Sequence, residues 1–412
     1  MKFETHSWKT TYAIFIWHGF FLSLTKSMLD LNTIFPALVT SLVDSKTLFG
    51  FLYAVMLGVP FAFNIFFGHY LQSRPFKKPF LLTGIYLRSF SFLGMASFIY
   101  FFARQSPGVV LISLFGWIFL FAFSGGFAGV SYADIIGKLM PRGARGKLYA
   151  AKQFAGSVAM LIGGMLIARI FALERFSYPV NYSLILGIGG LGLLIASVAF
   201  WFIREPATER TASSEERFRA FLSQVPALLR KDPAFLRFLV VENMASFSLM
   251  VLPFYMIFAK ESFAVGQEYV GRYLLFQIGG MILSNIFWGM LSGRKGSKSV
   301  VRICILVGGL IPVIAVILQR LGPEVFAVIF VLIGFVMSGR RVGFEPYLLD
   351  LAPEEKRTLY IGMNGTLNFS KILLPVLGGV FIDLIGFHIT FLIITGIMLL
   401  AFFLLGETQV DD

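Results

Sequence analysis

Long apolar runs separated by short polar turns fill most of the sequence. About 20 apolar residues in a helix are enough to cross the hydrocarbon core of a bilayer, and twelve runs reach this length. The pattern therefore predicts an all-α protein with twelve transmembrane helices, six on each side of the one long polar segment. The predicted ranges are 11–40, 47–69, 79–102, 109–134, 147–171, 181–203, 234–259, 268–291, 299–319, 324–350, 358–384 and 388–406.

A short motif occurs once in each half of the sequence. Asn64–Gly68 and Asn285–Gly289 both end an apolar run and are both followed by a basic turn. Pro36 and Pro253 end another pair of matching apolar stretches, again about 220 residues apart. Repeats at a fixed separation indicate a duplicated structural unit, here of roughly 200 residues. Because the two asparagines recur at equivalent depths, we expect each to make a structural hydrogen bond inside its own half.

The duplication predicts three parts, which are a six-helix bundle over 1–203, a linker over 204–233 and a second six-helix bundle over 234–412. Ser213–Glu216 in the linker has the spacing of a helix capping box, and apolar residues follow at helical intervals. This pattern predicts a short amphipathic helix along the inner membrane surface. Such a helix is either a tether between the bundles or a regulatory, partner-binding element.

Composition supports a membrane protein. Hydrophobic residues make up 57% of the 412 residues and charged residues only 14%, whereas about a quarter of a soluble domain is charged. The formal charge of +13 does not indicate a nucleic-acid partner, because the basic residues lie in short turns between apolar runs. The single cysteine, Cys304, excludes a disulfide framework. We expect no cofactor and no metal site. The polar N-terminus lacks a cleavage pattern, so the first helix is expected to act as an uncleaved insertion signal.

Lys and Arg gather in alternate turns, and the basic turns of a membrane protein face the cytoplasm. This bias predicts a multi-pass protein of a bacterial-type cytoplasmic membrane with both termini on the cytoplasmic side. The expected partners are the lipid bilayer, a small-molecule substrate and protons, and the expected state is a monomer. The inner turns include Arg74, Lys77, Lys78, Lys138, Arg142, Arg145, Arg294, Lys295 and Lys298.

Two of the basic turns carry a sequence signature made of glycines and basic residues. Each half of the chain matches this signature only in part. In the second half Gly289, Arg294, Gly296 and Lys298 match, and Gly293 stands where an acid is usual. In the first half the matching residues are Gly68, Lys77 and Lys78. With two similar halves and a long middle loop, the chain resembles the major facilitator superfamily of transporters.

That resemblance implies two bundles that rock about a central cavity, which is lined by helices one, four, seven and ten and holds the substrate near the midplane. The acid that helps to lock the family's inner gate is missing here. The resemblance therefore implies that the gate is held in another way, for which Asp134 at the end of the fourth helix is the candidate.

Ionisable side chains at membrane depth are costly, so each is a candidate functional residue. In the first helix, His18, Lys26 and Asp30 share one polar face. Lys26 and Asp30 are four residues apart and can touch. Either Asp30 carries the coupling proton and separates from a substrate-binding Lys26 during transport, or the two form a permanent pair. His18 is a candidate for proton relay.

The later helices carry further candidates. In the seventh helix, Glu242 is a candidate proton carrier beside Asn243, a candidate substrate contact; the alternative for Glu242 is a structural partner of Arg237 or of another helix. In the tenth helix, Arg341 and Glu345 are one turn apart and are expected to pair in a structural or gating role. Arg340 points elsewhere and suits capture of a carboxylate or phosphate.

The eleventh helix carries Asn364, Asn368 and Lys371 on one face, and Lys371 lies too deep to reach the membrane surface easily. We expect Asn368 and Lys371 to contact the substrate. Arg88 and Lys152 lie nearer the inner surface, where we expect them to pair with Asp134 or to reach lipid headgroups.

The sequence thus predicts a secondary transporter and not an enzyme. Basic groups outnumber acidic ones within the predicted helices, which favours a small anionic or zwitterionic solute moved by proton-coupled alternating access. One alternative is an exporter of amphipathic drugs or a lipid flippase of the same fold. An alternative of another class is a non-transporting membrane receptor or scaffold.

Overall fold

The computed structural model describes residues 7–72, 74–207, 229–353 and 357–406. Every regular element in these ranges is an α-helix or a short 3-10 helix, in agreement with the predicted fold class. The linker's predicted amphipathic helix lies outside the described residues. Two compact units make up the chain. Unit 1 comprises Met1–Asp44 and Leu52–Ser213, and unit 2 comprises Ser45–Phe51 and Ser214–Asp412.

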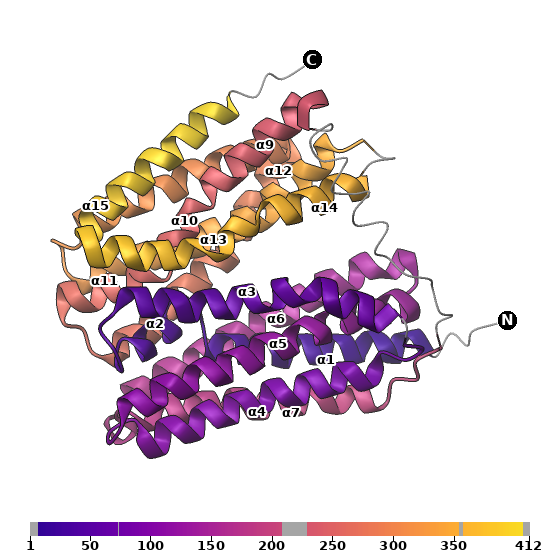
Figure 1. Ribbon diagram of the computed structural model, residues 1–412, viewed down its shortest axis with the longest axis horizontal. Coiled ribbons are helices and arrows are strands. Elements are labelled where there is room, and N and C mark those ends of the chain that lie inside the picture. Colours follow the sequence, from indigo (N-terminus) through magenta and orange to yellow (C-terminus); the bar gives the residue numbers. More distant parts are fainter. Residues whose placement is uncertain (1–6, 73, 208–228, 354–356, 407–412) are drawn as a thin grey trace. The chain divides into compact units, whose positions relative to one another are not determined.

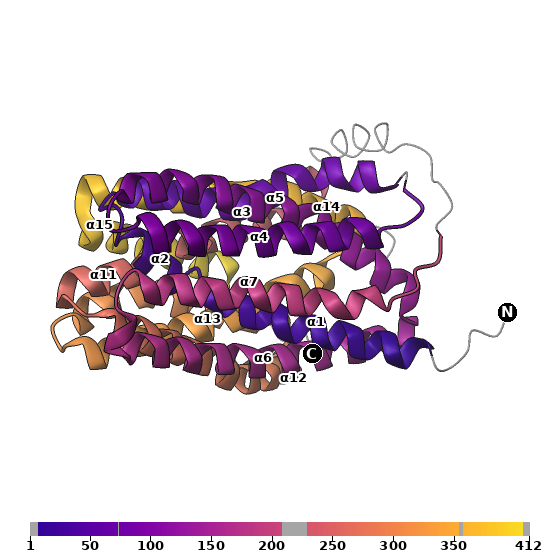
Figure 2. The ribbon, with the colours of Figure 1, turned by 90° about the horizontal axis from the view of Figure 1, so that it is seen from below.

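Unit 1 is built from long helices that run side by side (Figures 1 and 2). Helix α4 packs against both α5 and α7, and α1 packs against α6 and α7. The elements are α1 (Ser7–Met28), α2 (Ile34–Val39), α3 (Lys46–Gln72), α4 (Lys78–Phe102), α5 (Pro107–Leu139), α6 (Arg142–Ala172), η1 (Glu174–Phe176) and α7 (Val180–Trp201).

Unit 2 pairs α12 with α13 and α15, while α9 and α10 pack against α15. Its elements are α9 (Pro233–Ala245), α10 (Phe247–Val251), α11 (Phe254–Phe263), α12 (Gln267–Leu318), α13 (Pro323–Leu351), α14 (Arg357–Leu367), η3 (Phe369–Ile372) and α15 (Leu374–Leu405). The first turns of α3 also belong to this unit. There the Asp383 carboxylate accepts hydrogen bonds from Thr47 N and Thr47 Oγ1, at 2.9 and 2.7 Å, and Lys46 Nζ lies 2.8 Å from Glu261 Oε1.

Two predicted turns are glycine kinks within longer helical elements. Gly296 in α12 has a φ of 74° and Gly386 in α15 a φ of 77°, a conformation that glycine adopts without the penalty of a Cβ. Both lie where the sequence predicts a turn between two spans. In the described part of the chain, nine segments have the length and apolar composition needed to cross a membrane, α12 being counted once. The number of twelve spans stays a prediction.

Three of the predicted helices are interrupted in the structure. The length of an apolar run does not reveal such interruptions. The first run divides into α1 and α2, because Asp30 Oδ1 accepts the backbone N–H groups of Asn32 and Thr33 at 3.0 Å each and so competes with helical hydrogen bonding. The seventh run divides into α9, α10 and α11, with Pro253 at the second break. Proline lacks the N–H that would continue the helix. The eleventh run divides at η3.

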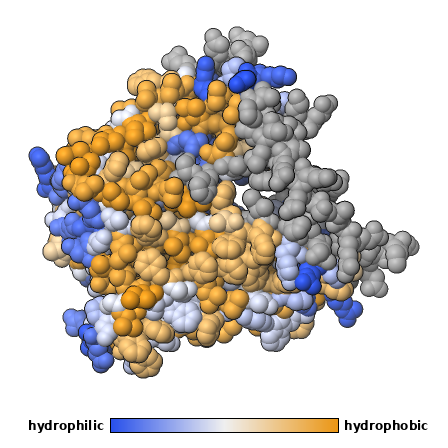
Figure 3. All heavy atoms as spheres, in the orientation of Figure 1, coloured by the Kyte–Doolittle hydropathy of each residue, from blue (hydrophilic) through white to orange (hydrophobic). Residues whose placement is uncertain are grey.

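The surface in Figure 3 is mostly hydrophobic, with hydrophilic residues confined to small patches. Large apolar side chains are exposed along the helices, for example Ile112 at 75%, Leu283 at 71% and Phe403 at 71%. Such a surface is stable in contact with lipid and not with water, and helices satisfy their backbone polar groups internally, as a bilayer requires. The chain is a multi-pass helical membrane protein.

Close helix packing in unit 2 depends on small residues, which gives a matched pair of substitutions in α12. A Cβ at Gly280 would meet the backbone of Val331 in α13, only 2.9 Å from its carbonyl carbon, whereas a Cβ at Gly279 would meet nothing within 4 Å. We expect Gly280→Ala to destabilise the protein by about 1–3 kcal/mol, since the backbone of α13 must shift. Gly279→Ala should be neutral or up to about 1 kcal/mol more stable. Thermal unfolding in detergent, followed by tryptophan fluorescence, measures both. Equal melting temperatures for the two variants would contradict the close α12–α13 contact.

Candidate functional site

The helix breaks of unit 2 bring its candidate residues together. Glu242 lies in the last turn of α9, just before the break at Ser246, and Asn368 and Lys371 lie where α14 gives way to η3. At a break the helical hydrogen-bond ladder stops, so polar groups at membrane depth need other partners inside the protein. The side chains around these two breaks supply them.

A buried ion pair forms the centre of this site. Lys371 Nζ lies 2.8 Å from Glu242 Oε1, and Asn368 Nδ2 donates to Glu242 Oε2 at 3.0 Å. Both carboxylate oxygens therefore have a partner from the α14–η3 segment. The Glu242 side chain is 7% exposed and that of Lys371 is 26% exposed, so the lysine is the more accessible member. The structure thus joins Glu242 to Asn368 and Lys371 of the eleventh predicted helix, so its partners lie in another helix and Arg237 is not its partner in this arrangement.

Asn368 is held from its other side by Asn364. Its Nδ2 also donates to the Asn364 carbonyl at 2.9 Å and to Asn364 Oδ1 at 2.6 Å. Asn368 Oδ1 is buried and has no hydrogen-bond partner. A buried acceptor without a partner is unusual, so this oxygen is available to a donor on a bound molecule.

Arg340 reaches the same break from α13. Its guanidinium donates to the Ala245 carbonyl at 3.0 Å and to Ser246 Oγ at 3.3 Å, and Ser246 Oγ donates to the Glu242 carbonyl at 2.7 Å. The Arg340 guanidinium is thus bound by groups of another helix, because the end of α9 exposes carbonyls that a cation can satisfy. Its charge still acts on both Glu242 and Lys371. The cluster therefore holds two cations and one carboxylate.

The remaining candidates of unit 2 lie outside this cluster. Asn243 Nδ2 donates to the Leu239 carbonyl of its own helix at 2.9 Å. Arg341 and Glu345 are both exposed, and among the described residues they do not form the predicted ion pair. Asn285 Oδ1 accepts a hydrogen bond from Ser338 Oγ at 2.6 Å, which is the structural bond expected for the repeated asparagine. The Asn64 side chain lies outside the described residues.

The signature turns hold structural contacts instead of substrate-binding groups. Gly289 and Arg294 precede the kink at Gly296, and Arg294 is exposed. Directly after the kink, Ser297 Oγ donates to Asp350 Oδ2 of α13. Lys298 follows in the same helix, and Gly68 of the first signature lies within α3.

An acidic residue that the sequence analysis missed organises the corresponding turn of unit 1. The Glu205 carboxylate, 2% exposed, accepts the backbone N–H groups of Lys77 and Lys78 at 2.8 and 2.7 Å. It also lies 2.6 Å from Lys138 Nζ, which pairs with Asp134 at 2.7 Å. Asp134 therefore belongs to this network, as a partner of Lys138. Glu205 comes directly after the sixth predicted helix, at the same side of the membrane as the basic turns. An acidic residue among these basic turns was the signal in the sequence that could have identified it.

Burial also affects the basic residues of this turn. Burial lowers the pKa of Lys77, and the nearby carboxylates of Asp134 and Glu205 offset this effect only in part. Lys78 Nζ donates to the carbonyls of Trp201 and Ile203 at 2.7 and 2.8 Å. These bonds join the start of α4 to the end of α7.

The predicted polar face of the first helix is divided by its break. Because α1 ends at Met28, Lys26 and Asp30 are not related by one helical turn as predicted. Asp30 Oδ1 accepts from Asn32 N, Thr33 N and Thr33 Oγ1 at 2.9–3.0 Å, which holds the turn into α2. Lys26 is exposed. His18 is 5% exposed and lies among aromatic rings of unit 1.

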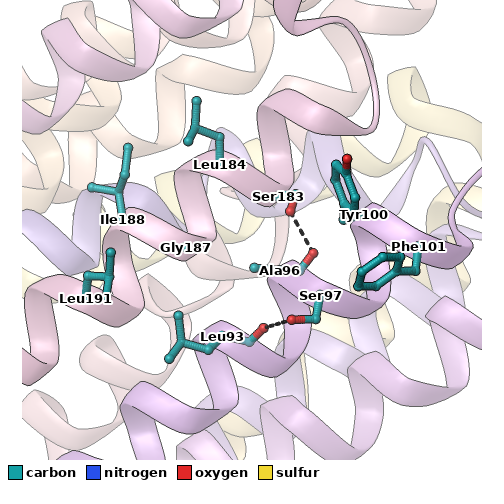
Figure 4. Close-up of a pocket in the computed structure, with 10 residues that line it drawn as sticks. All are labelled: Leu93, Ala96, Ser97, Tyr100, Phe101, Ser183, Leu184, Gly187, Ile188 and Leu191. Atoms are coloured by element: carbon teal, nitrogen blue, oxygen red, sulfur yellow. Dashed lines mark hydrogen bonds between the residues drawn. The ribbon is translucent and has the colours of Figure 1, made fainter.

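A shallow groove of about 340 Å³ lies between α4 and α7 (Figure 4). Both of its serines are already hydrogen-bonded, since Ser183 Oγ of α7 donates to the Ala96 carbonyl of α4 and Ser97 Oγ donates to the Leu93 carbonyl within α4. None of its lining residues is ionisable apart from Tyr100. The groove suits apolar contact and not capture of a charged solute.

Comparisons with known proteins agree with the class that the fold defines. The chain belongs to the Major Facilitator Superfamily, whose sequence profile matches residues 16–282 and 243–410. This family consists of membrane transporters, so transport is the function that the family supports. An uncharacterized protein of Aquifex aeolicus (strain VF5) is 22% identical over 395 residues, which are 93% of each chain.

Solved transporter structures share the fold. A D-xylose-proton symporter matches with a TM-score of 0.67 and 14% identity over 97% of both chains. The nucleoside transporter NupG matches with a TM-score of 0.72 and 13% identity over 96% of this chain and 98% of the other. A bacterial homologue of the iron transporter ferroportin, in an inward-facing state, gives a TM-score of 0.69 and 14% identity over 96% and 97%.

We expect Glu205→Gln to lower stability by about 3 kcal/mol or more, because it removes the buried charge that compensates Lys138 and the two backbone N–H groups. Glu174→Gln is the control, since Glu174 is an exposed glutamate of the same unit. Thermal unfolding in detergent measures the difference. If Glu205→Gln has the same melting temperature as Glu174→Gln, the network around Glu205 contributes little to the stability of the fold.

Proposed function

We propose that the protein is a secondary transporter that moves a small organic anion or zwitterion by proton-coupled alternating access. The observation that carries this proposal is the buried Glu242–Lys371 pair at the two helix breaks of unit 2. Discontinuous helices are where transporters commonly place their binding groups. A buried ion pair contributes little net stability, since desolvation offsets the attraction, so its presence here favours a role in binding.

The pair offers a direct means of coupling a proton to a solute. An incoming carboxylate or phosphate competes with Glu242 for Lys371, the more accessible member. When Lys371 turns to the solute, the Glu242 carboxylate remains buried without its cation and binds a proton. Solute anion and proton thus enter together, and the original pair forms again after both leave. Asp30 is placed less well for this role, because its Oδ1 already holds the turn between α1 and α2.

The charges of the cluster favour the solute class. Arg340 and Lys371 outnumber the single carboxylate of Glu242, which attracts a negative group. The buried Asn368 Oδ1 accepts no hydrogen bond and suits an ammonium or hydroxyl donor on the same solute. Together these groups support an anionic or zwitterionic solute over an apolar drug or a lipid tail. They also speak against a scaffold, which gains nothing from a charged cluster at membrane depth.

We further propose that the protein acts as a monomer in a bacterial-type cytoplasmic membrane with both termini in the cytoplasm. The support is the bias of Lys and Arg toward alternate turns.

Glu242→Gln tests the coupling step. In proteoliposomes, we expect this variant to retain exchange of the solute across the membrane but to lose its accumulation in response to a pH gradient, since the amide cannot take up the proton. Glu174→Gln, which changes an exposed glutamate, should accumulate the solute like the unchanged protein. The solute is found by screening a panel of labelled organic acids and amino acids. Undiminished gradient-driven accumulation by Glu242→Gln would remove this residue from the coupling step.

Lys371→Met tests the binding step. It leaves Glu242 buried without its cation, so we expect a loss of about 3–5 kcal/mol in stability together with a loss of solute binding. In the double variant Glu242→Gln/Lys371→Met, which is neutral, stability should recover while binding stays absent. Thermal unfolding and equilibrium binding in detergent measure these two effects, with Lys147→Met, at an exposed position, as control. If the double variant binds the solute normally, the site lies elsewhere.

A further inference from the structure

Unit 1 contains a second group of polar side chains, one of them buried and three half-buried, which the Glu242–Lys371 pair does not use. His18 comes from α1, Arg88 from α4, Tyr132 from α5 and Lys152 from α6. Three of their atoms, His18 Nδ1, Arg88 Nε and Tyr132 Oη, are buried and have no hydrogen-bond partner. Buried polar atoms nearly always have partners, so three unpaired atoms in one group call for an explanation.

Lys152 is a cation without a carboxylate partner in the described part of the chain. Its Nζ lies 4.5 Å from the centre of the Tyr132 ring and 5.3 Å from that of Tyr149. Its stem runs along α1, where a Cβ at Gly19 would be 3.3 Å from Lys152 Cγ. The expected pairing with Asp134 is not formed, because Asp134 pairs with Lys138. Lys152 is therefore held next to His18 and Tyr132 by packing and cation–π contacts.

Arg88 is a second such cation. Its guanidinium carbon lies 4.2 Å from the centre of the Phe121 ring, and Gly125, one turn further along α5, leaves it room: a Cβ there would be 3.7 Å from the guanidinium. Within the described residues no carboxylate pairs with it either. Gly125 and Tyr132 are two turns apart on one face of α5, so Arg88 lies along the same face as Lys152, on the order of 10 Å from it.

His18 lies between these cations. Its ring packs against Tyr132 and Phe200, with centroid distances of 5.3 and 4.8 Å. One ring nitrogen is hydrogen-bonded to the Ala196 backbone, and the charges of Lys152, Arg88 and Lys26 all act on the imidazole. The other nitrogen, Nδ1, is unpaired. Every full charge that acts on His18 is thus positive.

Two half-buried cations without an acidic partner are unfavourable, and cation–π contacts recover only about 0.5–2 kcal/mol each. The missing partner is a negative group. We propose that unit 1 binds the oxyanion of an organic acid or phosphate ester between Lys152, Tyr132 Oη and His18 Nδ1, with Arg88 binding a second oxygen or a second acidic group further along α5. Nitrogen and hydroxyl donors of this kind recognise carboxylates and phosphates.

Binding at this position takes up one proton. The nitrogen of His18 that faces Ala196 donates to a carbonyl, so a neutral ring leaves Nδ1 without a hydrogen. Contact between Nδ1 and an oxyanion therefore requires a proton from the solvent, which stays between the two atoms until the anion leaves. The other groups that face His18 are Lys26 of α1, Arg88 of α4, Tyr132 of α5 and Lys152 of α6; Phe200 of α7 cannot titrate.

The inference goes beyond the proposed function, because it needs neither transport nor the Glu242–Lys371 pair. The same oxyanion chemistry is found in a soluble solute and in the phosphate of a lipid headgroup. The test therefore uses the full chain in nanodiscs of two lipid compositions, with phenyl phosphate, benzoate and inorganic phosphate as probes. Isothermal titration calorimetry in two buffers of different ionisation enthalpy gives affinity and proton uptake together.

In phosphatidylcholine nanodiscs we expect at least one probe to bind with uptake of one proton. Lys152→Gln should weaken this binding about ten-fold or more, which is the effect of losing a charge-assisted hydrogen bond. Tyr132→Phe, which keeps the aromatic ring, should weaken it several-fold. Lys147→Gln, at an exposed position on the same helix, should bind like the unchanged protein. His18→Gln should bind without taking up a proton.

Lipid composition decides the source of the oxyanion. If phosphatidylglycerol in the nanodisc competes with the probes in a manner that depends on Lys152, the site accepts lipid headgroups; if it does not compete, the site is selective for soluble anions. Both results support the oxyanion site. The proposal is overturned if none of the three probes binds and phosphatidylglycerol has no Lys152-dependent effect, or if Lys152→Gln and Tyr132→Phe bind like the unchanged protein.

The Lys371→Met variant separates this inference from the proposed function. Phenyl phosphate binding that persists in Lys371→Met but is lost in Lys152→Gln belongs to unit 1. Binding lost only in Lys371→Met belongs to unit 2 and counts against the unit 1 site, whatever the transport assays show.

Discussion

The bilayer interior offers no hydrogen-bond partners, and this constraint determines most of what the structure does. Continuous helices meet it by themselves. Where a helix stops at membrane depth, side chains must complete it, as Arg340 does at the Ala245 carbonyl. The Glu242–Lys371 pair depends on the same breaks, because the end of α9 and the α14–η3 junction bring a carboxylate and an ammonium within 2.8 Å. The chemistry that favours transport is thus a consequence of interrupted backbone.

The duplicated halves of the sequence use their polar groups in different ways. In unit 2 the carboxylate of Glu242 balances one of two nearby cations. In unit 1 Arg88 and Lys152 lie over aromatic rings, and three buried polar atoms remain unpaired. Duplication therefore preserved the architecture, with its repeated signature turns, while the charged groups diverged.

The turn after α3 is held by a carboxylate from a distant part of the sequence. Where the family signature usually has an acid, this chain has none, and Glu205 from the end of α7 accepts the two backbone N–H groups that open α4. Because this carboxylate is far from the turn in sequence, a motif comparison cannot assign it. The same holds for Asp350, which accepts the hydroxyl of Ser297 in unit 2. Both contacts fix the start of a helix against a neighbour, which the local signature only partly encodes.

The sequence by itself determined the fold class, the family and most helix positions among the described residues, because bilayer thickness sets the length of apolar runs and glycine and proline mark turns locally. It also singled out Glu242, Arg340, Asn368 and Lys371, since a charge within an apolar run is visible without a structure. Only the tertiary structure decided which of them meet. The turn after Met28 is held by local hydrogen bonds of Asp30, while the break after Ala245 exposes the carbonyl that Arg340 binds and lies beside the Glu242–Lys371 pair. Which side chains pair across helices depends on the depth of each residue in the membrane and on the rotation of each helix about its axis. The spacing of residues along the sequence specifies neither.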